Sequence, residues 1–380
     1  MSITIDGQVL TPAGWLRGSI EHDHGRIVAV RGSAVDEAEV LASDALRLLP
    51  GFVDLHVHGG GGADTMQGDA ADGGAAAIDT IARLHARHGT TSLLATTMTA
   101  PLEEIRAALQ ALAPACSERR SGCARVLGVH LEGPYISPDK LGAQPDFARA
   151  PQLEEMLALH AIAPLRLLTL APEVGGMLAL IPQLVQAGIR VQIGHSAATY
   201  EQACAALAQG ASGFTHLFNA MSALHHRAPG VAGAALAHAE HAELIPDLLH
   251  VHPGAICAAL RAIDGLYCVT DATAAAGMPD GEYRLGRHAV HKCLGGVRLA
   301  DGTLAGSTLT MDQALRNLVG LGLTLAEASR RTSTLAAARL GLTERGQLVA
   351  GAWADVVAFD RSLALHAVWV EGEAIDLSSA

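Results

Sequence analysis

The sequence is poor in aromatic and charged residues and has no long apolar run. Aromatic residues make up 3% and charged residues 17% of the 380 positions. No uninterrupted apolar run reaches the roughly 18 residues that a membrane-spanning helix needs. The formal net charge is −12, and no block of Lys or Arg interrupts this acidic balance. We therefore expect no nucleic-acid partner and no membrane partner, although one or two local cations would suffice for a small anionic substrate.

Cysteine pairs and a targeting segment are also missing from the sequence. The six cysteines are scattered and form no CxxC pair, so we expect reduced and mostly buried thiols. The first residues, MSITIDGQVL, have neither the basic start nor the apolar stretch of a secretory signal. These features predict a cytoplasmic protein.

Small and apolar residues are abundant, and they alternate in a regular pattern. Half of the residues are hydrophobic and 41 are glycine, which favours a layered α/β fold. Short β-like runs lie at residues 48–58, 90–99, 125–136, 165–173, 188–196, 212–221, 243–251 and 266–274. Helical patterns lie at 75–88, 101–112, 151–161, 177–187, 199–209, 253–263, 310–320 and 324–340. Eight strands with intervening helices predict a (β/α)8 barrel of the TIM type. The alternative is a doubly wound sheet, but no GxGxxG fingerprint opens the chain.

The two ends of the chain differ from its middle, because they contain short strands punctuated by glycine and aspartate. We expect residues 1–49 and 345–380 to pair into a small β-sandwich domain, and residues 50–344 to form the barrel. The glycine-rich segment 276–306 predicts a β-hairpin inserted after the eighth barrel strand.

Polar residues recur at the C-terminal ends of the expected strands, where barrels build their active sites. They are His56, His58, Glu132, His195, His216 and Asp271. Alternate residues of a strand face the same side, so His56 and His58 can converge on one ion. Imidazole and carboxylate groups are ligands for zinc or a similar divalent ion, and a catalytic site keeps one position open for water.

Each polar residue also has an ordinary structural explanation. A single histidine at a strand end is usually capped or solvated, and Asp271 could cap a turn. In a metal site, Asp271 would instead take a proton from water and return it to a leaving group. Glu132 could be a turn residue before Gly-Pro, but a buried carboxylate needs a partner. The side chain of Arg227 could be solvated, or it could bind a phosphate through two hydrogen bonds. The recurrence of polar groups at five strand ends favours a site.

Six ordered motifs between about residues 48 and 316 carry a family resemblance. They are LPGFVDLHVHG, GVHLEGPYIS, IGHSAATYEQA, THLFNAMSALHHRAPGVAG, LYCVTDAT and GTLAGSTLTM. Together they resemble the N-acetylglucosamine-6-phosphate deacetylases of the amidohydrolase superfamily. The resemblance implies metal-dependent hydrolysis of the N-acetyl group of N-acetylglucosamine 6-phosphate, in amino-sugar catabolism. It also implies a homodimer in which the neighbouring subunit can contribute to the phosphate site.

The resemblance further implies roles for individual residues. Glu132, His195 and His216 would bind one divalent ion, and His56 and His58 would hold a second ion or shape a one-metal site. The ion would be zinc, with iron as the alternative, and Asp271 would be the catalytic acid and base. Substrate contacts would come from Ala143, Gln144, Asn219, Ala220, Arg227, His250 and the backbone of Leu304, Ala305 and Gly306.

Two departures from the family pattern keep alternatives open. Gln144 stands where many members carry a histidine that contacts the N-acetyl carbonyl. Leu248 and Leu249 alter the residues before His250, so that His252 competes with His250 for the phosphate role. The sugar could therefore be the galacto epimer, or the substrate another N-acyl or cyclic amide. A barrel kept only for binding is the non-enzymatic alternative, although such proteins usually lose their ligands.

Overall fold

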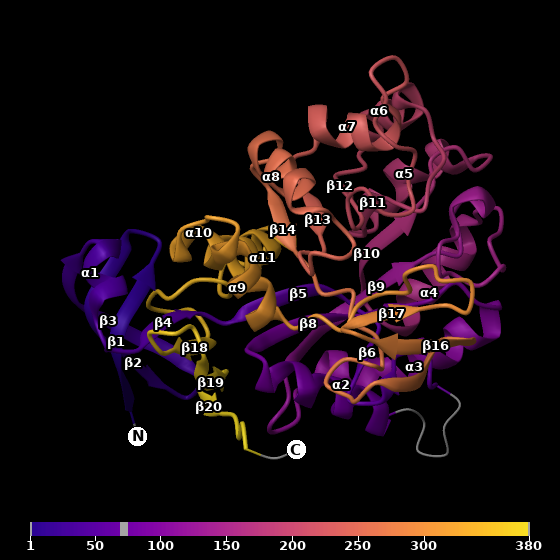
Figure 1. The fold of residues 1–380 in the computed structure, drawn as a ribbon. Coiled ribbons are helices and arrows are strands. Elements are labelled where there is room, and N and C mark those ends of the chain that lie inside the picture. Colours follow the sequence, from indigo (N-terminus) through magenta and orange to yellow (C-terminus); the bar gives the residue numbers. More distant parts are fainter. Residues whose placement is uncertain (1, 69–74, 379–380) are drawn as a thin grey trace.

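The computed structural model describes residues 2–68 and 75–378, which form a barrel and a separate sheet (Figure 1). The barrel sheet has eight parallel strands in the order β14-β13-β12-β11-β10-β9-β8-β5. Their bounds are β5 (Phe52–Val57), β8 (Thr90–Thr97), β9 (Arg125–Glu132), β10 (Leu165–Leu170), β11 (Arg190–Ile193), β12 (Gly213–Phe214), β13 (Ala242–Leu244) and β14 (Leu266–Cys268). The predicted (β/α)8 barrel is confirmed.

Backbone contacts beyond the end of β14 close the barrel onto β5. The N–H of Asp271 donates to the carbonyl of His56 over 2.9 Å, and the N–H of His58 donates to the carbonyl of Ala272 over 2.9 Å. Gly59 makes this approach possible, since a Cβ there would lie 2.5 Å from the backbone nitrogen of Ala274. The closure thus brings the first and last polar strand ends together.

Helices surround the barrel sheet (Figure 1). They are α2 (Ala75–Arg87), α3 (Leu102–Ser117), α4 (Leu153–Ile162), α5 (Met177–Gln186), α6 (Tyr200–Ala208), α7 (Gly230–His238), α8 (Pro253–Ala262), α9 (Met311–Gly320), α10 (Leu325–Ser329) and α11 (Leu335–Arg339). A π-helical turn, Arg330–Thr334, joins the last two. The sequence pattern did not predict α7, because its residues are small and mostly buried and leave no polar stripe. Within the described residues, no helix combines the length and apolarity needed to cross a membrane.

The two chain ends form one seven-stranded sheet in the order β20-β19-β18-β4-β1-β2-β3. The strands are β1 (Ile3–Thr11), β2 (Gly14–Asp23), β3 (Arg26–Val35), β4 (Arg47–Pro50), β18 (Val356–Phe359), β19 (Leu365–Val370) and β20 (Glu373–Ala374); the short helix α1 (Glu37–Ala42) precedes β4. β4 joins the ends, since it pairs in parallel with β1 and antiparallel with β18. The indigo and yellow segments of Figure 1 therefore lie side by side. The division at residues 49 and 345 stays a prediction.

The expected insertion after the eighth strand is present, and it has three strands rather than two. They are β15 (Gly281–Leu285), β16 (His288–Cys293) and β17 (Gly296–Arg298) in an antiparallel sheet. A small apolar core under this sheet includes Met98, Leu285 and Ala305. The insertion and the segment that follows it form one wall of the site.

Candidate active site

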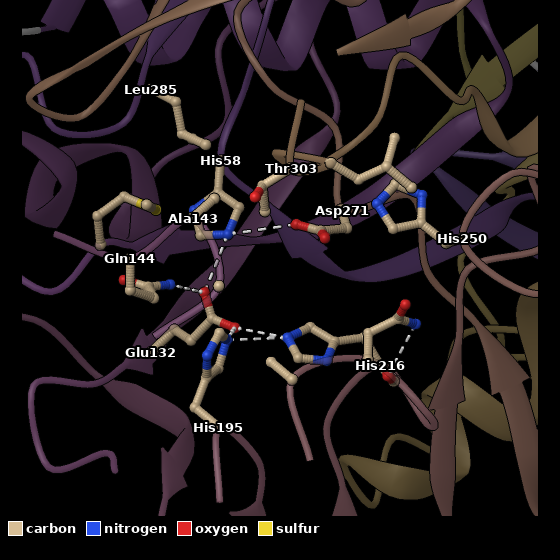
Figure 2. Close-up of a pocket in the computed structure, with 16 residues that line it drawn as sticks. His58, Glu132, Ala143, Gln144, His195, His216, His250, Asp271, Leu285 and Thr303 are labelled. Atoms are coloured by element: carbon tan, nitrogen blue, oxygen red, sulfur yellow. Dashed lines mark hydrogen bonds and ion pairs between the residues drawn. The ribbon is translucent and has the colours of Figure 1, made fainter. Parts of the chain in front are cut away.

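A cavity of about 230 Å³ opens at the C-terminal ends of the barrel strands (Figure 2). Polar strand-end residues line its floor: His58, Glu132, His195, His216 and Asp271. Predicted substrate contacts form part of its wall: Ala143, Gln144, Asn219, Ala220, His250, Leu304 and Gly306. Met98, Gly142, Leu285 and Thr303, which sequence reasoning missed, complete the lining. The structure thus brings most of the predicted residues into one place.

Three of the strand-end residues have a left-handed backbone. The φ angles are 47° at His195, 27° at His216 and 52° at Asp271, a region that residues other than glycine rarely adopt. At each position the chain turns sharply after its strand, and the side chain faces the barrel mouth. Such strain persists only where the surrounding structure holds it, and it clusters at functional sites.

The first group of candidate ligands is Glu132, His195 and His216. Oε1 of Glu132 lies 3.1 Å from Nε2 of His195 and 3.1 Å from Nε2 of His216, and the two Nε2 atoms are 3.1 Å apart. Nδ1 of His195 lies 2.8 Å from the carbonyl of Lys140, so it carries the hydrogen and leaves a lone pair on Nε2. Nitrogen and oxygen ligands about 2 Å from a zinc ion lie roughly 3 Å from one another. The donor set therefore fits a divalent ion.

The second group is His56, His58 and Asp271. The two Nε2 atoms are 3.1 Å apart, and Oδ1 of Asp271 lies 3.3 Å from Nε2 of His58 and 3.5 Å from that of His56. Oε2 of Glu132 lies 3.1 Å from Nε2 of His58. Glu132 therefore presents one oxygen to each group, and the donor atoms fit a second ion beside the first.

The charges of the two groups depend on one another. Burial lowers the pKa of His58, but hydrogen bonds with Asp271 and Glu132 outweigh this effect and raise the pKa to about 9. Burial raises the pKa of Glu132, but the nearby His56 and His195 bring it well below its usual range. The pKa of Asp271 is lowered in the same way by the neighbouring histidines, against the effect of burial. Bound metal ions would replace protons at these imidazoles.

Gln144 is fixed in the cavity wall at both ends of its amide. Its nitrogen donates to Oε2 of Glu132 over 2.6 Å, and its oxygen accepts the N–H of Thr99 over 2.7 Å. Since an amide nitrogen has two hydrogens, one remains for a ligand. The side chain therefore holds Glu132 in place and still faces the cavity (Figure 2).

The histidines after β13 have separate roles in the structure. His250 lines the cavity, and its Nδ1 lies 2.6 Å from Oδ2 of Asp247. Burial lowers the pKa of His250, but Asp247 outweighs this effect and raises the pKa above its usual value. His252 instead caps α8, where its ring accepts the N–H of Gly254. The geometry thus favours His250 over His252 as a cavity residue.

Two predicted contacts lie outside the cavity of the single chain. Arg227 is exposed on a turn, where its guanidinium is 2.8 Å from Nε2 of His226. The side chain of Ala305 is buried in the small core of the insertion, between the cavity-lining Leu304 and Gly306. The predicted substrate contacts of both residues stay predictions.

A layer of polar residues below the cavity escaped the sequence prediction. Glu243 on β13, His130 on β9 and Gln192 on β11 are fully buried inside the barrel. One signal in the sequence could have predicted this layer. Glu243 is a carboxylate within the short apolar run AELI, and a buried acid needs hydrogen-bond partners.

A closed parallel barrel with imidazole and carboxylate groups at its strand ends defines a class of metal-dependent hydrolases. Residues 47–375 match the model of the Amidohydrolase family, and the chain belongs to this family.

Similar proteins include two bacterial deacetylases of amino-sugar phosphates. An N-acetylgalactosamine-6-phosphate deacetylase from Escherichia coli O157:H7 is 43% identical over 378 residues, which cover 96% of this chain and 97% of the relative. An N-acetylglucosamine-6-phosphate deacetylase from Lysinibacillus sphaericus is 44% identical over 326 residues, 84% of this chain and 83% of the relative.

A solved structure extends this similarity to the whole fold. It is an N-acetyl-D-glucosamine-6-phosphate deacetylase from Mycobacterium smegmatis, in which one aspartate is mutated to alanine, in complex with N-acetyl-D-glucosamine 6-phosphate. This structure has a TM-score of 0.88 and 36% identity, and the match covers 99% of both chains.

Proposed function

We propose that the protein hydrolyses the N-acetyl group of N-acetylglucosamine 6-phosphate, which yields glucosamine 6-phosphate and acetate in amino-sugar catabolism. The observation that carries this proposal is the complete set of strand-end residues at one cavity: His58, Glu132, His195, His216 and Asp271 line it, and His56 is buried directly beside His58 and Asp271. The family membership and the deacetylases at 43–44% identity support the same reaction.

Asp271 is the proposed proton carrier. Its carboxylate takes a proton from the water that attacks the acetamide carbonyl carbon, and it delivers this proton to the amine nitrogen as the C–N bond breaks. His58 holds the carboxylate in position from 3.3 Å. A divalent ion bound by Glu132, His195 and His216 would supply Lewis-acid chemistry to the carbonyl and the water.

Zinc is the proposed ion, with iron as the alternative, because both accept imidazole and carboxylate ligands. We place a first ion at Glu132, His195 and His216, and a second at His56, His58 and Asp271. Metal analysis of protein prepared with each metal tests this assignment. One ion per subunit would leave His56 and His58 to shape a one-metal site, and a stoichiometry below one with both metals would contradict the first site as well.

The phosphate is proposed to lie against His250, whose raised pKa increases the fraction of imidazolium. Arg227 is exposed in the single chain, so we propose that it reaches the phosphate of a neighbouring subunit in a homodimer. Arg227→Ala should raise KM for the phosphorylated substrate about tenfold, the effect of losing roughly 1.4 kcal/mol of binding. Unphosphorylated N-acetylglucosamine should be unaffected in a steady-state assay, and an equal effect on both substrates would contradict this role. Light scattering of the purified protein tests the dimer.

The galacto epimer is the second candidate substrate, because one of the two bacterial relatives carries that name. The solved structure with bound N-acetyl-D-glucosamine 6-phosphate supports the gluco epimer. Acetate release from the two 6-phosphates distinguishes them, and we expect the higher kcat/KM for the gluco epimer. A higher value for the galacto epimer would reassign the sugar. No release from either by metal-loaded enzyme would overturn the deacetylase proposal.

We propose the cytoplasm as the site of the reaction. All six cysteines are unpaired, which suits a reducing compartment. Cell fractionation of the native host, with activity measured in each fraction, tests this placement.

A further inference from the structure

We infer that Glu243 is a positioning residue that holds one histidine of each candidate metal group from beneath the cavity. It lies on β13, a strand that carries none of the candidate ligands, and its side chain is fully buried. This inference rests on the metal site of the proposed function and concerns how that site is built.

One carboxylate oxygen of Glu243 reaches both groups. Oε2 lies 3.0 Å from Nδ1 of His56 and accepts the backbone N–H of His216 over 3.2 Å. Because an ionised carboxylate only accepts, Nδ1 of His56 carries the hydrogen, and its Nε2 faces His58 and Asp271, the other members of its candidate metal group. A hydrogen bond of this kind fixes both the tautomer and the orientation of a ligating imidazole.

The contact with His216 supports a strained part of the backbone. His216 has a φ of 27°, and the next residue, Leu217, donates its N–H to the carbonyl of Glu243 over 2.8 Å. Glu243 therefore binds two successive N–H groups of this turn, one through its side chain and one through its main chain. The conformation of this turn determines the position of the His216 imidazole.

Glu243 is itself held by neighbours on two other strands. Oε1 accepts from the amide nitrogen of Gln192 over 2.9 Å and lies 3.3 Å from the hydroxyl of Tyr267. That hydroxyl also lies 2.9 Å from the amide oxygen of Gln192. Since all three side chains are buried, the carboxylate has one well-defined position below the two histidines.

The same carboxylate could instead bind a buried ion together with His56 and His130, whose donor atoms lie near one another. The partners of His130 argue against an ion there. Its Nδ1 donates to the carbonyl of Leu55 over 3.1 Å, and its Nε2 lies 2.7 Å from the hydroxyl of Thr169. Both ring nitrogens are therefore in use, and the layer is a hydrogen-bonded support for the ligands above it.

Glu243→Gln tests the inference, because it keeps the shape of the side chain and removes its charge. Metal affinity is measured by competition with a chelator of known strength, and the ligand geometry by the absorption spectrum of the Co²⁺-loaded protein. We expect affinity for at least one ion to fall roughly 10- to 100-fold and the Co²⁺ spectrum to change. The ion at His56 should be affected more strongly, since that contact is a direct one to the imidazole.

Asp355→Asn is the matched control. Asp355 is also buried, but it lies where the barrel meets the terminal sheet, and its carboxylate binds Arg345 there. This variant should leave metal affinity and the Co²⁺ spectrum unchanged. Tyr267→Phe, which removes only one partner of Glu243, should weaken metal binding less than Glu243→Gln and keeps the test informative if the latter does not fold. Wild-type affinity and spectrum in folded Glu243→Gln, or in Tyr267→Phe if Glu243→Gln does not fold, would overturn the inference. Failure of the wild-type protein to bind metal would instead overturn the proposed function.

Discussion

Carboxylates at the barrel mouth and at the junction between barrel and terminal sheet are both largely shielded from solvent, and the molecule satisfies them differently. At the junction, Glu371 faces three arginines. Arg125 binds both of its oxygens at 2.9 Å, Arg119 lies 3.1 Å away, and Arg345 completes the set. At the mouth, Glu132 faces imidazoles and the amide of Gln144.

The difference lies in whether the partners can satisfy the carboxylate alone. Arginine is always charged and offers several N–H donors, so the junction needs no further ion. The imidazole of His195 has its hydrogen fixed on Nδ1 by a carbonyl, and its Nε2 lone pair lies 3.1 Å from Oε1 of Glu132. A metal ion between these atoms would bind the lone pair and the carboxylate together. The junction is therefore expected to act in stability, and the mouth in metal binding and catalysis.

The largest expected effect separates the two regions by activity. Asp271→Asn should lower turnover about 10³-fold, because the amide cannot carry the proton from water to the amine. The ion at Glu132, His195 and His216 should remain, and the unfolding midpoint should change little. Acetate release, measured beside metal content, checks this expectation. Turnover near the wild-type value would contradict the role of Asp271.

The second prediction concerns the junction. Glu371→Gln should lower the free energy of unfolding by about 2 kcal/mol, because Arg125 loses its carboxylate partner, while Arg345 keeps Asp355 and Arg119 keeps Glu373. Turnover per folded molecule should stay the same, since Glu371 lies in the terminal sheet away from the cavity. Urea unfolding gives the free energy, and the exposed Glu154→Gln is the control. An unchanged unfolding curve would contradict a stabilising role of the Glu371 carboxylate.

These two regions also differ in how far they could be predicted from the sequence. Glu132, His195 and Asp271 each lie at the end of an apolar run in the sequence. Once the runs are identified as barrel strands, these residues can be predicted to lie at one end of the barrel. The pair of Arg125 and Glu371 spans 246 positions, and no local pattern signals such a contact.

The details within the site had no local signal either. The tautomers of the histidines depend on carbonyls such as that of Lys140, which the loops bring into place. The support from Glu243 depends on the packing of strand β13 beside β12. The motif predicts a phosphate contact for Arg227, and its turn faces solvent in the single chain, so the sequence does not say which subunit this residue serves. Position along a strand was predictable, whereas orientation required tertiary contacts.

The third prediction uses metal addition to distinguish the regions. Zinc at 100 times its Kd should raise the free energy of unfolding by about 2.7 kcal/mol, because it binds the folded state. Glu371→Gln should gain the same increment from its lower starting value. His195→Ala should gain much less, since it loses one ligand of the first group. Unfolding curves at several zinc concentrations check this, and equal gains in all three proteins would contradict the assigned site.

The smallest expected effect is the acid sensitivity of the junction. Burial raises the pKa of Glu371, but Arg125 and Arg345 outweigh this effect and lower the pKa to about 2. The unfolded chain has a pKa near the ordinary value of about 4.3, so this group stabilises the fold above that pH. The contribution is lost as the pH falls from about 4.3 towards 2.

Between about pH 4.3 and pH 3, the wild type should therefore lose about 1 kcal/mol more stability than Glu371→Gln. Urea unfolding of both proteins across this range isolates the effect of the one carboxylate from that of all others. The exposed Glu154→Gln is the control and should keep the wild-type slope, because it leaves the junction intact. Parallel curves for wild type and Glu371→Gln would mean that the arginines do not hold the charge of Glu371 in the folded state.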